Sequence, residues 1–178
     1  MAKRVESKKI YEGRLFDVAL ERFRIHGKTI TREIVKHPGA AAILPILPDG
    51  KILLVKQYRH AVGEVLVEIP AGTLEPGEEP EECAYRELEE ETGYRAGSMR
   101  KIASLALAPG YSSEVIHIYL AENLAESDAH PEEDESITLL RAGLDEVVEM
   151  IRRGEIRDAK TVAAILLYML EKGWLRSA

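Results

Sequence analysis

The sequence is notable first for what it lacks. It contains one cysteine, Cys83, so the chain cannot form an internal disulfide. No apolar run approaches the ~20 residues that a membrane-spanning helix needs. The basic residues 1–10 are not followed by the apolar segment of a secretory signal, so we expect a cytoplasmic protein without a membrane partner. The histidines show no zinc-ligand spacing, and no glycine-rich phosphate loop or G-x-S-x-G nucleophile elbow is present.

Acidic residues are concentrated in one segment instead of being spread along the chain. The sequence has 31 acidic and 24 basic residues, a formal net charge of −7. Residues 78–91 alone carry eight glutamates and one arginine, which also gives −7. The remainder is therefore balanced and has no basic stripe, so we do not expect a nucleic-acid partner.

The acidic segment ends in residues 86–91, with the sequence RELEEE. In a helix, Glu87, Glu90 and Glu91 share about 100° of the surface and repel one another. A hard divalent cation removes that repulsion, and Mg²⁺ in proteins typically binds a few carboxylates together with substrate phosphates. A solvated, glutamate-rich surface helix is the simpler alternative, and composition alone leaves both open.

The spacing of the wider segment, from residue 72 to residue 94, decides between these alternatives. It resembles the signature of the Nudix hydrolases, G-x5-E-x7-R-E-U-x-E-E-x-G-U, in which U is a bulky aliphatic residue. Tyr94 at the last position is aromatic instead of aliphatic. The other eight of the nine fixed positions match, and they are Gly72, Glu78, Arg86, Glu87, Leu88, Glu90, Glu91 and Gly93.

The resemblance implies an α/β fold, an α/β/α sandwich with a mixed sheet, and the hydrophobic pattern agrees with it. The continuous apolar run from residue 40 to 47 predicts a strand that is buried on both faces. Proline at residue 80 and glycine at residue 93 predict a helix over residues 80–92, and Asp158 is expected to cap the last helix. Further strands are expected at residues 51–58, 65–69, 99–107, 115–121 and 137–140.

We expect two regions, an N-terminal β region over residues 1–38 and a Nudix hydrolase domain over residues 39–178. Residues 8–37 read as small antiparallel strands with a tight turn at residues 26–28. So few strands have little core of their own, and they must pack on the main domain or on a second subunit. In similar enzymes these strands contribute to a dimer, so a homodimer is expected.

The resemblance also implies which residues bind metal. Glu87, Glu90, Glu91 and the carbonyl of Ala71 are expected to hold Mg²⁺, with Mn²⁺ as a possible substitute and two or three ions in the site. Glu90 is also a candidate catalytic residue. Arg86 is a further catalytic candidate, expected to pair with a carboxylate such as Glu78 and to hold the preceding loop against the helix.

Segments outside the signature resemble the ADP-ribose pyrophosphatase branch of the family. These segments are QYR ending at Arg59, the run EIPAG from Glu68 to Gly72, and Pro109-Gly110, which begins 16 residues after Gly93. Arg59, Glu68, Pro109 and Gly110 are accordingly expected to bind substrate. An acidic run before a strand matches a family segment that supplies the general base and a further metal ligand, and its candidates are Glu133 and Glu135.

The expected function is Mg²⁺-dependent hydrolysis of the small molecule ADP-ribose to AMP and ribose 5-phosphate. The same chemistry on another nucleoside diphosphate sugar, such as GDP-mannose, is the nearest alternative. A non-catalytic, nucleotide-binding regulator is the third. Binding without turnover does not require the glutamates of the signature, and all of them are present.

Overall fold

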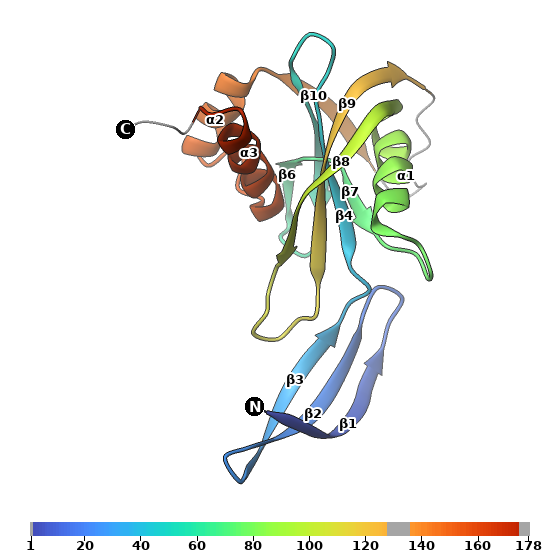
Figure 1. Ribbon diagram of the computed structural model, residues 1–178, viewed down its shortest axis with the longest axis vertical. Helices are drawn as coiled ribbons and strands as arrows, with labels where there is room; N and C mark the ends of the chain where they lie inside the picture. Colours follow the sequence, from blue (N-terminus) through green and yellow to red (C-terminus); the bar gives the residue numbers. More distant parts are fainter. Residues whose placement is uncertain (1, 128–135, 175–178) are drawn as a thin grey trace.

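The computed structural model describes residues 2–127 and 136–174, which form three β-sheets and three helices (Figure 1). The N-terminal sheet consists of β1 (Lys3–Glu12), β2 (Asp17–Ile25) and β3 (Lys28–Lys36). The central sheet has the order β7 (Ala71–Thr73), β4 (Ala40–Pro45), β9 (Val115–Glu126) and β8 (Tyr94–Ala106). The third sheet has the order β10 (Ile137–Ala142), β5 (Ile52–Arg59) and β6 (Glu64–Glu68). The helices are α1 (Pro80–Thr92), α2 (Leu144–Arg152) and α3 (Ala159–Glu171).

Strand β4 is the centre of the molecule. It pairs in parallel with β9 and antiparallel with β7, so the central sheet is mixed, as expected. All six residues of β4 are buried, which confirms the prediction of a strand covered on both faces. Its side chains alternate between two hydrophobic clusters, with Ala41 and Ile43 in one and Ala42 and Leu44 in the other.

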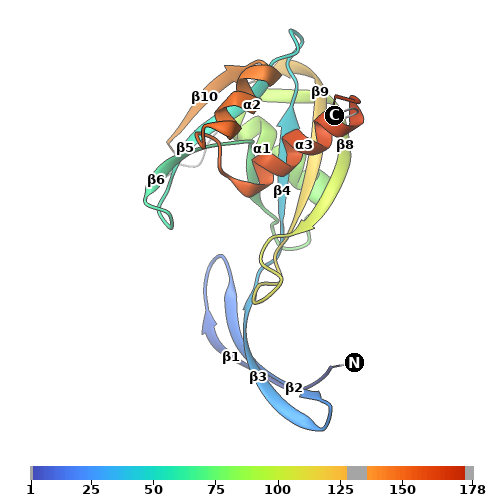
Figure 2. The same ribbon diagram turned by 90° about the vertical axis from the view of Figure 1, so that its left-hand side faces the viewer.

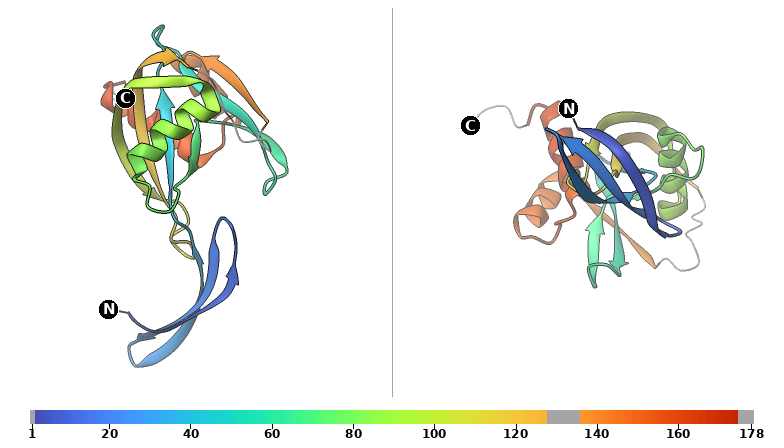
Figure 3. Two further views of the ribbon diagram at one scale, coloured as in Figure 1. Left: turned by 90° about the vertical axis from the view of Figure 1, so that its right-hand side faces the viewer. Right: turned by 90° about the horizontal axis from the view of Figure 1, so that it is seen from below.

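The two clusters define the layers of a sandwich. Helix α1 covers one face of the sheets with Cys83, Ala84 and Leu88, whereas α2 and α3 cover the other face with residues such as Val147 and Ile165 (Figures 1 and 3). Strand β5 also contributes to both clusters. The predicted α/β/α sandwich is therefore confirmed. None of the helices in the described ranges has the length and apolarity needed to cross a membrane.

The N-terminal sheet extends away from the sandwich (Figure 2). Its end is tied to the loop between β8 and β9, because Val35 donates its backbone N–H to the carbonyl of Tyr111 at 2.8 Å and accepts from Ser113 at 2.9 Å. The sequence predicted strands from residue 8 onward, but β1 already begins at Lys3. Every residue of β1 is exposed, so the apolar alternation that marks a half-buried strand is missing.

Helix α1 has the bounds that the sequence predicted. Pro80 occupies the first turn, and the backbone N–H of Glu79 donates to the Glu82 side chain at 3.2 Å. Gly93 ends the helix in the left-handed region, with φ 68°. Strand β8 then starts at Tyr94 rather than at residue 99, because residues 94–98 pair with an extension of β9 beyond residue 121.

Helix α3 is joined to the end of β6 by a buried hydrogen bond. Asp158 caps the helix, as predicted, by accepting the Thr161 N–H at 2.9 Å and the Thr161 hydroxyl at 2.6 Å. The Thr161 hydroxyl oxygen in turn accepts the backbone N–H of Ile69 at 2.9 Å. Both Thr161 and Ile69 are fully buried, so this backbone N–H depends on Thr161 as its acceptor.

We predict that Thr161→Val lowers the free energy of unfolding by about 1–3 kcal/mol, because a buried N–H loses its acceptor while the shape of the side chain is kept. Urea denaturation monitored by circular dichroism measures this change. Thr138→Val, in the exposed part of β10, is the matched control and should change stability by less than about 0.5 kcal/mol. Equal losses in the two variants would contradict the assigned role of the Thr161 hydroxyl.

Candidate functional site

The carboxylate of Glu87 lies directly against Gly72 of β7. A Cβ atom added to Gly72 would sit 1.8 Å from Glu87 Oε1, far inside van der Waals contact. The absence of a side chain at residue 72 therefore allows α1 to bring a carboxylate up to the strand backbone. The same approach is visible at Cys83, whose Sγ lies 3.7 Å from the carbonyl of Gly72.

Arg86 holds the loop before α1 against the helix. Its Nε and Nη2 donate to the two oxygens of Glu78 at 2.8 and 3.0 Å, and Nη2 also reaches the carbonyl of Thr73 at 3.3 Å. The hydrogen bond from Arg86 lowers the pKa of Glu78, and Glu78 in turn raises the pKa of Arg86. The predicted pairing of Arg86 with Glu78 is thus confirmed.

The remaining edge of the Arg86 guanidinium faces the candidate metal ligands. Nη1 donates to Glu87 Oε1 at 2.6 Å and to Glu90 Oε2 at 3.0 Å. Part of the like-charge repulsion along α1 is therefore offset by a side chain from the same helix. In the described ranges, no three His, Cys, Asp or Glu side chains converge as a metal-binding group, and Glu87 and Glu90 are both paired with Arg86.

Glu91 connects the helix to the backbone of Ala71. Glu91 is 6% exposed, and its Oε2 accepts the N–H of Ala71 at 3.1 Å. Glu91 also acts on Arg59 at the end of β5. The hydrogen bond with Glu68 is the main cause of the raised pKa of Arg59, and the charge of Glu91 adds to it. The structure thus brings the signature helix and the predicted substrate-binding arginine into one electrostatic environment.

Arg59 and Glu68 form a bidentate ion pair. Arg59 Nε donates to Glu68 Oε1 at 2.9 Å, and Nη2 donates to Oε2 at 2.8 Å. Lys160, from the first turn of α3, also donates to Glu68 Oε2, and it lies 3.1 Å from Asp158 Oδ1. Burial raises the pKa of Glu68, but the hydrogen bonds and charges of Arg59 and Lys160 outweigh burial and lower that pKa.

The donor chemistry of this region fits a hard cation. Three carboxylates lie on one face of α1, those of Glu87, Glu90 and Glu91. Because residue 72 is glycine, no side chain from β7 occupies the space beside Glu87. Carboxylate oxygens are the ligands that Mg²⁺ and Mn²⁺ prefer. The assignment of Ala71, Glu87, Glu90 and Glu91 as metal ligands stays a prediction.

Other predicted site residues lie elsewhere. Pro109 and Gly110 are exposed in the loop between β8 and β9, whose hydrogen bonds run to Val35 of β3 and to His37, which follows β3. Their predicted contact with substrate stays a prediction. Glu133 and Glu135 lie outside the described residues.

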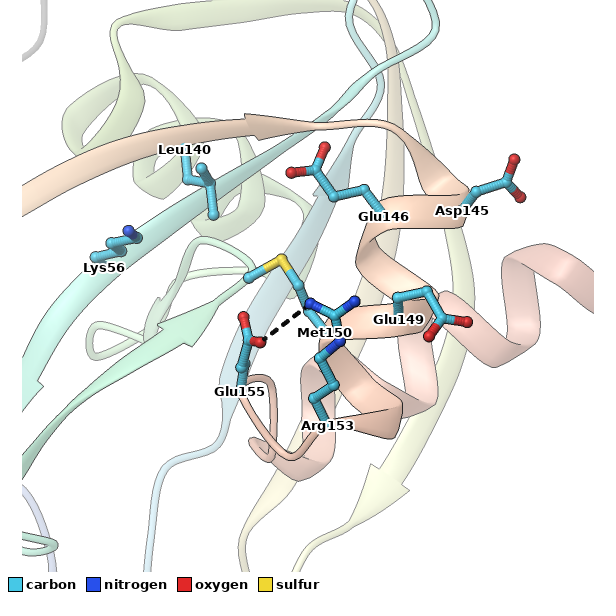
Figure 4. Close-up of a pocket in the computed structure, with 8 residues that line it drawn as sticks. All are labelled: Lys56, Leu140, Asp145, Glu146, Glu149, Met150, Arg153 and Glu155. Carbon is cyan, nitrogen blue, oxygen red and sulfur yellow. Dashed lines mark ion pairs between the residues drawn. The ribbon is translucent and has the colours of Figure 1, made fainter.

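A hollow of about 460 Å³ is separate from this site (Figure 4). It lies beside β5, β10 and α2, and Met150 and Leu140 form its apolar part. Its charged lining includes the ion pair between Arg153 and Glu155, at 3.8 Å. None of the residues predicted to bind metal or substrate lines it.

Lys160 is the site residue that the sequence analysis missed. A lysine in the first turn of a helix opposes the helix dipole, which favours negative charge at that end. That mismatch is the one signal in the sequence that could have indicated a special role. Its partner Glu68 is 92 residues away, so the pairing itself could not be inferred from local spacing.

Comparison with known proteins places this geometry in context. A family model described as the NUDIX domain matches residues 35–165. An ADP-ribose pyrophosphatase from Bacillus subtilis (strain 168) is 42% identical over 173 residues, covering 96% of this chain and 94% of the relative. A methanol dehydrogenase activator from Bacillus methanolicus is 41% identical with the same coverage. A GDP-mannose pyrophosphatase from Shigella flexneri serotype 5b (strain 8401) is 35% identical, covering 86% and 90%.

A solved structure of an ADP compounds hydrolase matches the whole architecture. Its TM-score is 0.85, and the match covers 99% of this chain and 97% of that one. The sequence identity is 24%, so this likeness supports the fold alone. It agrees with the sandwich and the additional N-terminal sheet described above.

We predict that Gly72→Ala lowers the free energy of unfolding by about 1–3 kcal/mol, because the new methyl group must displace the Glu87 carboxylate or the helix that carries it. Thermal and urea denaturation measure the loss. Gly110→Ala is the matched control, since an added Cβ there meets no atom within 4 Å. If both variants keep the parent stability, Gly72 does not limit the approach of α1.

Proposed function

This chain belongs to the NUDIX family and is a hydrolase, and on that premise we propose that it cleaves the diphosphate bond of ADP-ribose. One observation carries the proposal: Glu91 of α1 accepts the N–H of Ala71, and its charge also acts on Arg59, which is paired with Glu68. Carboxylates that suit a divalent cation and a guanidinium that suits phosphate oxygens are the two parts that diphosphate binding needs. Relatives named ADP-ribose pyrophosphatase, at 42% and 38% identity, support ADP-ribose as the substrate.

In the proposed reaction, water adds to one phosphorus and the bridging P–O bond breaks, giving AMP and ribose 5-phosphate. Arg59 binds the diphosphate and orients it. Arg86, anchored on Glu78, keeps the glutamates of α1 in place through Glu87 and Glu90. The general base is assigned to Glu133 or Glu135, in a segment outside the described residues, and Glu90 is the further catalytic candidate.

Glu87, Glu90, Glu91 and the carbonyl of Ala71 would hold two or three Mg²⁺ ions, or Mn²⁺ in their place. When bound, such ions neutralise phosphate oxygens and lower the pKa of the attacking water. In this proposal the ligands come from α1 and β7, and the missing side chain at Gly72 lets Glu87 approach the β7 backbone.

Another nucleoside diphosphate sugar is the second candidate substrate. Relatives named GDP-mannose pyrophosphatase are 35% identical over most of the chain, and the parts described above recognise a diphosphate rather than a base or sugar. A non-catalytic regulator is disfavoured, because the chain retains every glutamate of the signature.

We also propose that two copies of the chain, acting in the cytoplasm, associate through the N-terminal β region (residues 1–38), with residues 39–178 as the hydrolase domain. Strand β1 is exposed along its length, and Val5, Ile10 and Tyr11 are each about half exposed there. Exposed apolar side chains on an extended sheet favour a protein partner. A sedimentation mass equal to a single chain at micromolar concentration would contradict the dimer.

We predict that, with Mg²⁺ present, the protein hydrolyses ADP-ribose with a kcat/KM at least about tenfold above that for GDP-mannose, ADP-glucose or nucleoside triphosphates. Mass spectrometry of the products should show AMP and ribose 5-phosphate. A preference for GDP-mannose would agree with diphosphate hydrolysis but would make a different nucleoside diphosphate sugar, the second candidate, the substrate. Failure to hydrolyse every compound tested would refute the proposed activity.

We predict that Glu87→Gln and Glu91→Gln each lower kcat by on the order of 100-fold or more, because each removes a charged ligand while keeping the side-chain size. Activity should be measured across a Mg²⁺ titration, alongside the melting temperature of each variant. Glu81→Gln, at an exposed position of the same helix, is the matched control. Near-normal rates in both variants would contradict the assignment of Glu87 and Glu91 as metal ligands.

A further inference from the structure

Lys160 is unusual because it is a lysine that is 8% exposed, in the first turn of a helix. Burial of an ammonium group is unfavourable, and the positive end of the helix dipole adds to the cost. Its charge is balanced by Glu68 and, at 3.1 Å, by Asp158. A buried ion pair of this kind is weak evidence for stability, because apolar residues of similar size often stabilise as well or better.

The packing of α3 against the sheet is explained by contacts other than those of Lys160. The hydrogen bond between Ile69 and Thr161 already joins the helix to the end of β6, and Ala164 and Ile165 of α3 belong to the hydrophobic core. The ion pair of Lys160 is therefore not needed to attach the helix. The ion pair also restrains Glu68, which is 1% exposed and binds Arg59.

The contacts of Glu68 form a chain from α3 to Arg59. Each oxygen of Glu68 accepts one hydrogen bond from Arg59, and Oε2 accepts a further one from Lys160. With Arg59 as its only partner, the carboxylate of Glu68 could rotate together with the guanidinium. The third donor, Lys160, comes from α3 and holds the carboxylate plane in one orientation. A fixed carboxylate plane in turn fixes the plane of the paired guanidinium.

The orientation of Arg59 matters because only one edge of its guanidinium is hydrogen-bonded to Glu68. The pair uses the Nε and Nη2 edge, so Nη1 lies on the side away from the carboxylate. The Arg59 side chain is 34% exposed, whereas the side chains of Glu68 and Lys160 are 2% and 10% exposed. Arg59 is therefore the member of the chain that can meet a ligand.

We propose that Lys160 is a positioning residue that acts through Glu68 to orient Arg59 toward the substrate diphosphate. This inference rests on the proposed function, since it assigns Arg59 a diphosphate oxygen to bind. Lys160 itself touches no substrate atom. Its effect is on substrate binding, because Arg59 is not among the groups proposed to hold the metal or to act as the general base.

The test is a double-mutant cycle with ADP-ribose as substrate, using the full chain with Mg²⁺. Lys160→Met should raise KM about tenfold and leave kcat within about twofold. Glu68 keeps Arg59 as its bidentate partner in this variant, so its charge stays paired, and the melting temperature is measured alongside. In an Arg59→Met background, Lys160→Met should have no further effect on KM, because its route of action is gone. Arg157→Met is the matched control. It removes a neighbouring cation that pairs with Glu64 instead, and should leave KM unchanged.

Three results would overturn the inference. An equal increase in KM in the Arg59→Met background would mean that Lys160 contacts substrate directly. A lower melting temperature with an unchanged KM would mean that the ion pair is structural. A parent protein that hydrolyses no diphosphate substrate would refute the proposed function, and this inference with it. Should Lys160→Met fail to fold, Glu68→Gln, which keeps the side-chain size, is taken through the same cycle with the same expectation.

Discussion

Repulsion between carboxylates on one helix is the constraint around which the rest of the site is arranged. Helix α1 carries Glu87, Glu90 and Glu91 along one face, an arrangement that is unfavourable without a counter-charge. Arg86 supplies part of that charge from the same helix, and Glu78 holds Arg86 in place from the loop before it. The glycine at residue 72 then permits the helix to sit against β7. Each feature depends on the one before it, which explains why the segment is recognisable as a unit.

Much of the fold could be predicted from local sequence because local chemistry determines it. Pro80 and Gly93 mark the ends of α1 through backbone geometry that few other residues provide. The apolar run that forms β4 has no polar alternation, so it required burial on both faces, and both are covered. The pairing of Arg86 with a carboxylate such as Glu78 was expected from the resemblance to the Nudix signature. In each case the cause lies within a few residues of the effect.

The parts that the sequence did not reveal depend on distant partners. Strand β1 has no buried side chain, so its length comes from pairing with β2 and leaves no apolar pattern. Strand β8 begins five residues earlier than predicted because β9 extends far enough to pair with it. Lys160 is buried beside Glu68, contributed by β6, and Asp158, and these two carboxylates balance its charge in the folded chain. Predictions from periodicity fail where pairing or charge neutralisation, rather than apolar burial, orders the residues.

The attachment of the N-terminal sheet has a consequence for protein engineering. Strand β3 is joined to the β8–β9 loop by two backbone hydrogen bonds at Val35, and the N–H of His37 donates to the Ser113 hydroxyl. The sheet and the loop that contains Pro109 and Gly110 are therefore hydrogen-bonded to each other, although some 70 residues separate them in the chain. On the side of the sheet all three bonds use backbone groups, so a chimera that takes the sheet from a relative but keeps the parental loop retains these donors and acceptors. The sheet can therefore be exchanged by itself, whereas a replacement of the loop must keep a hydroxyl side chain at residue 113.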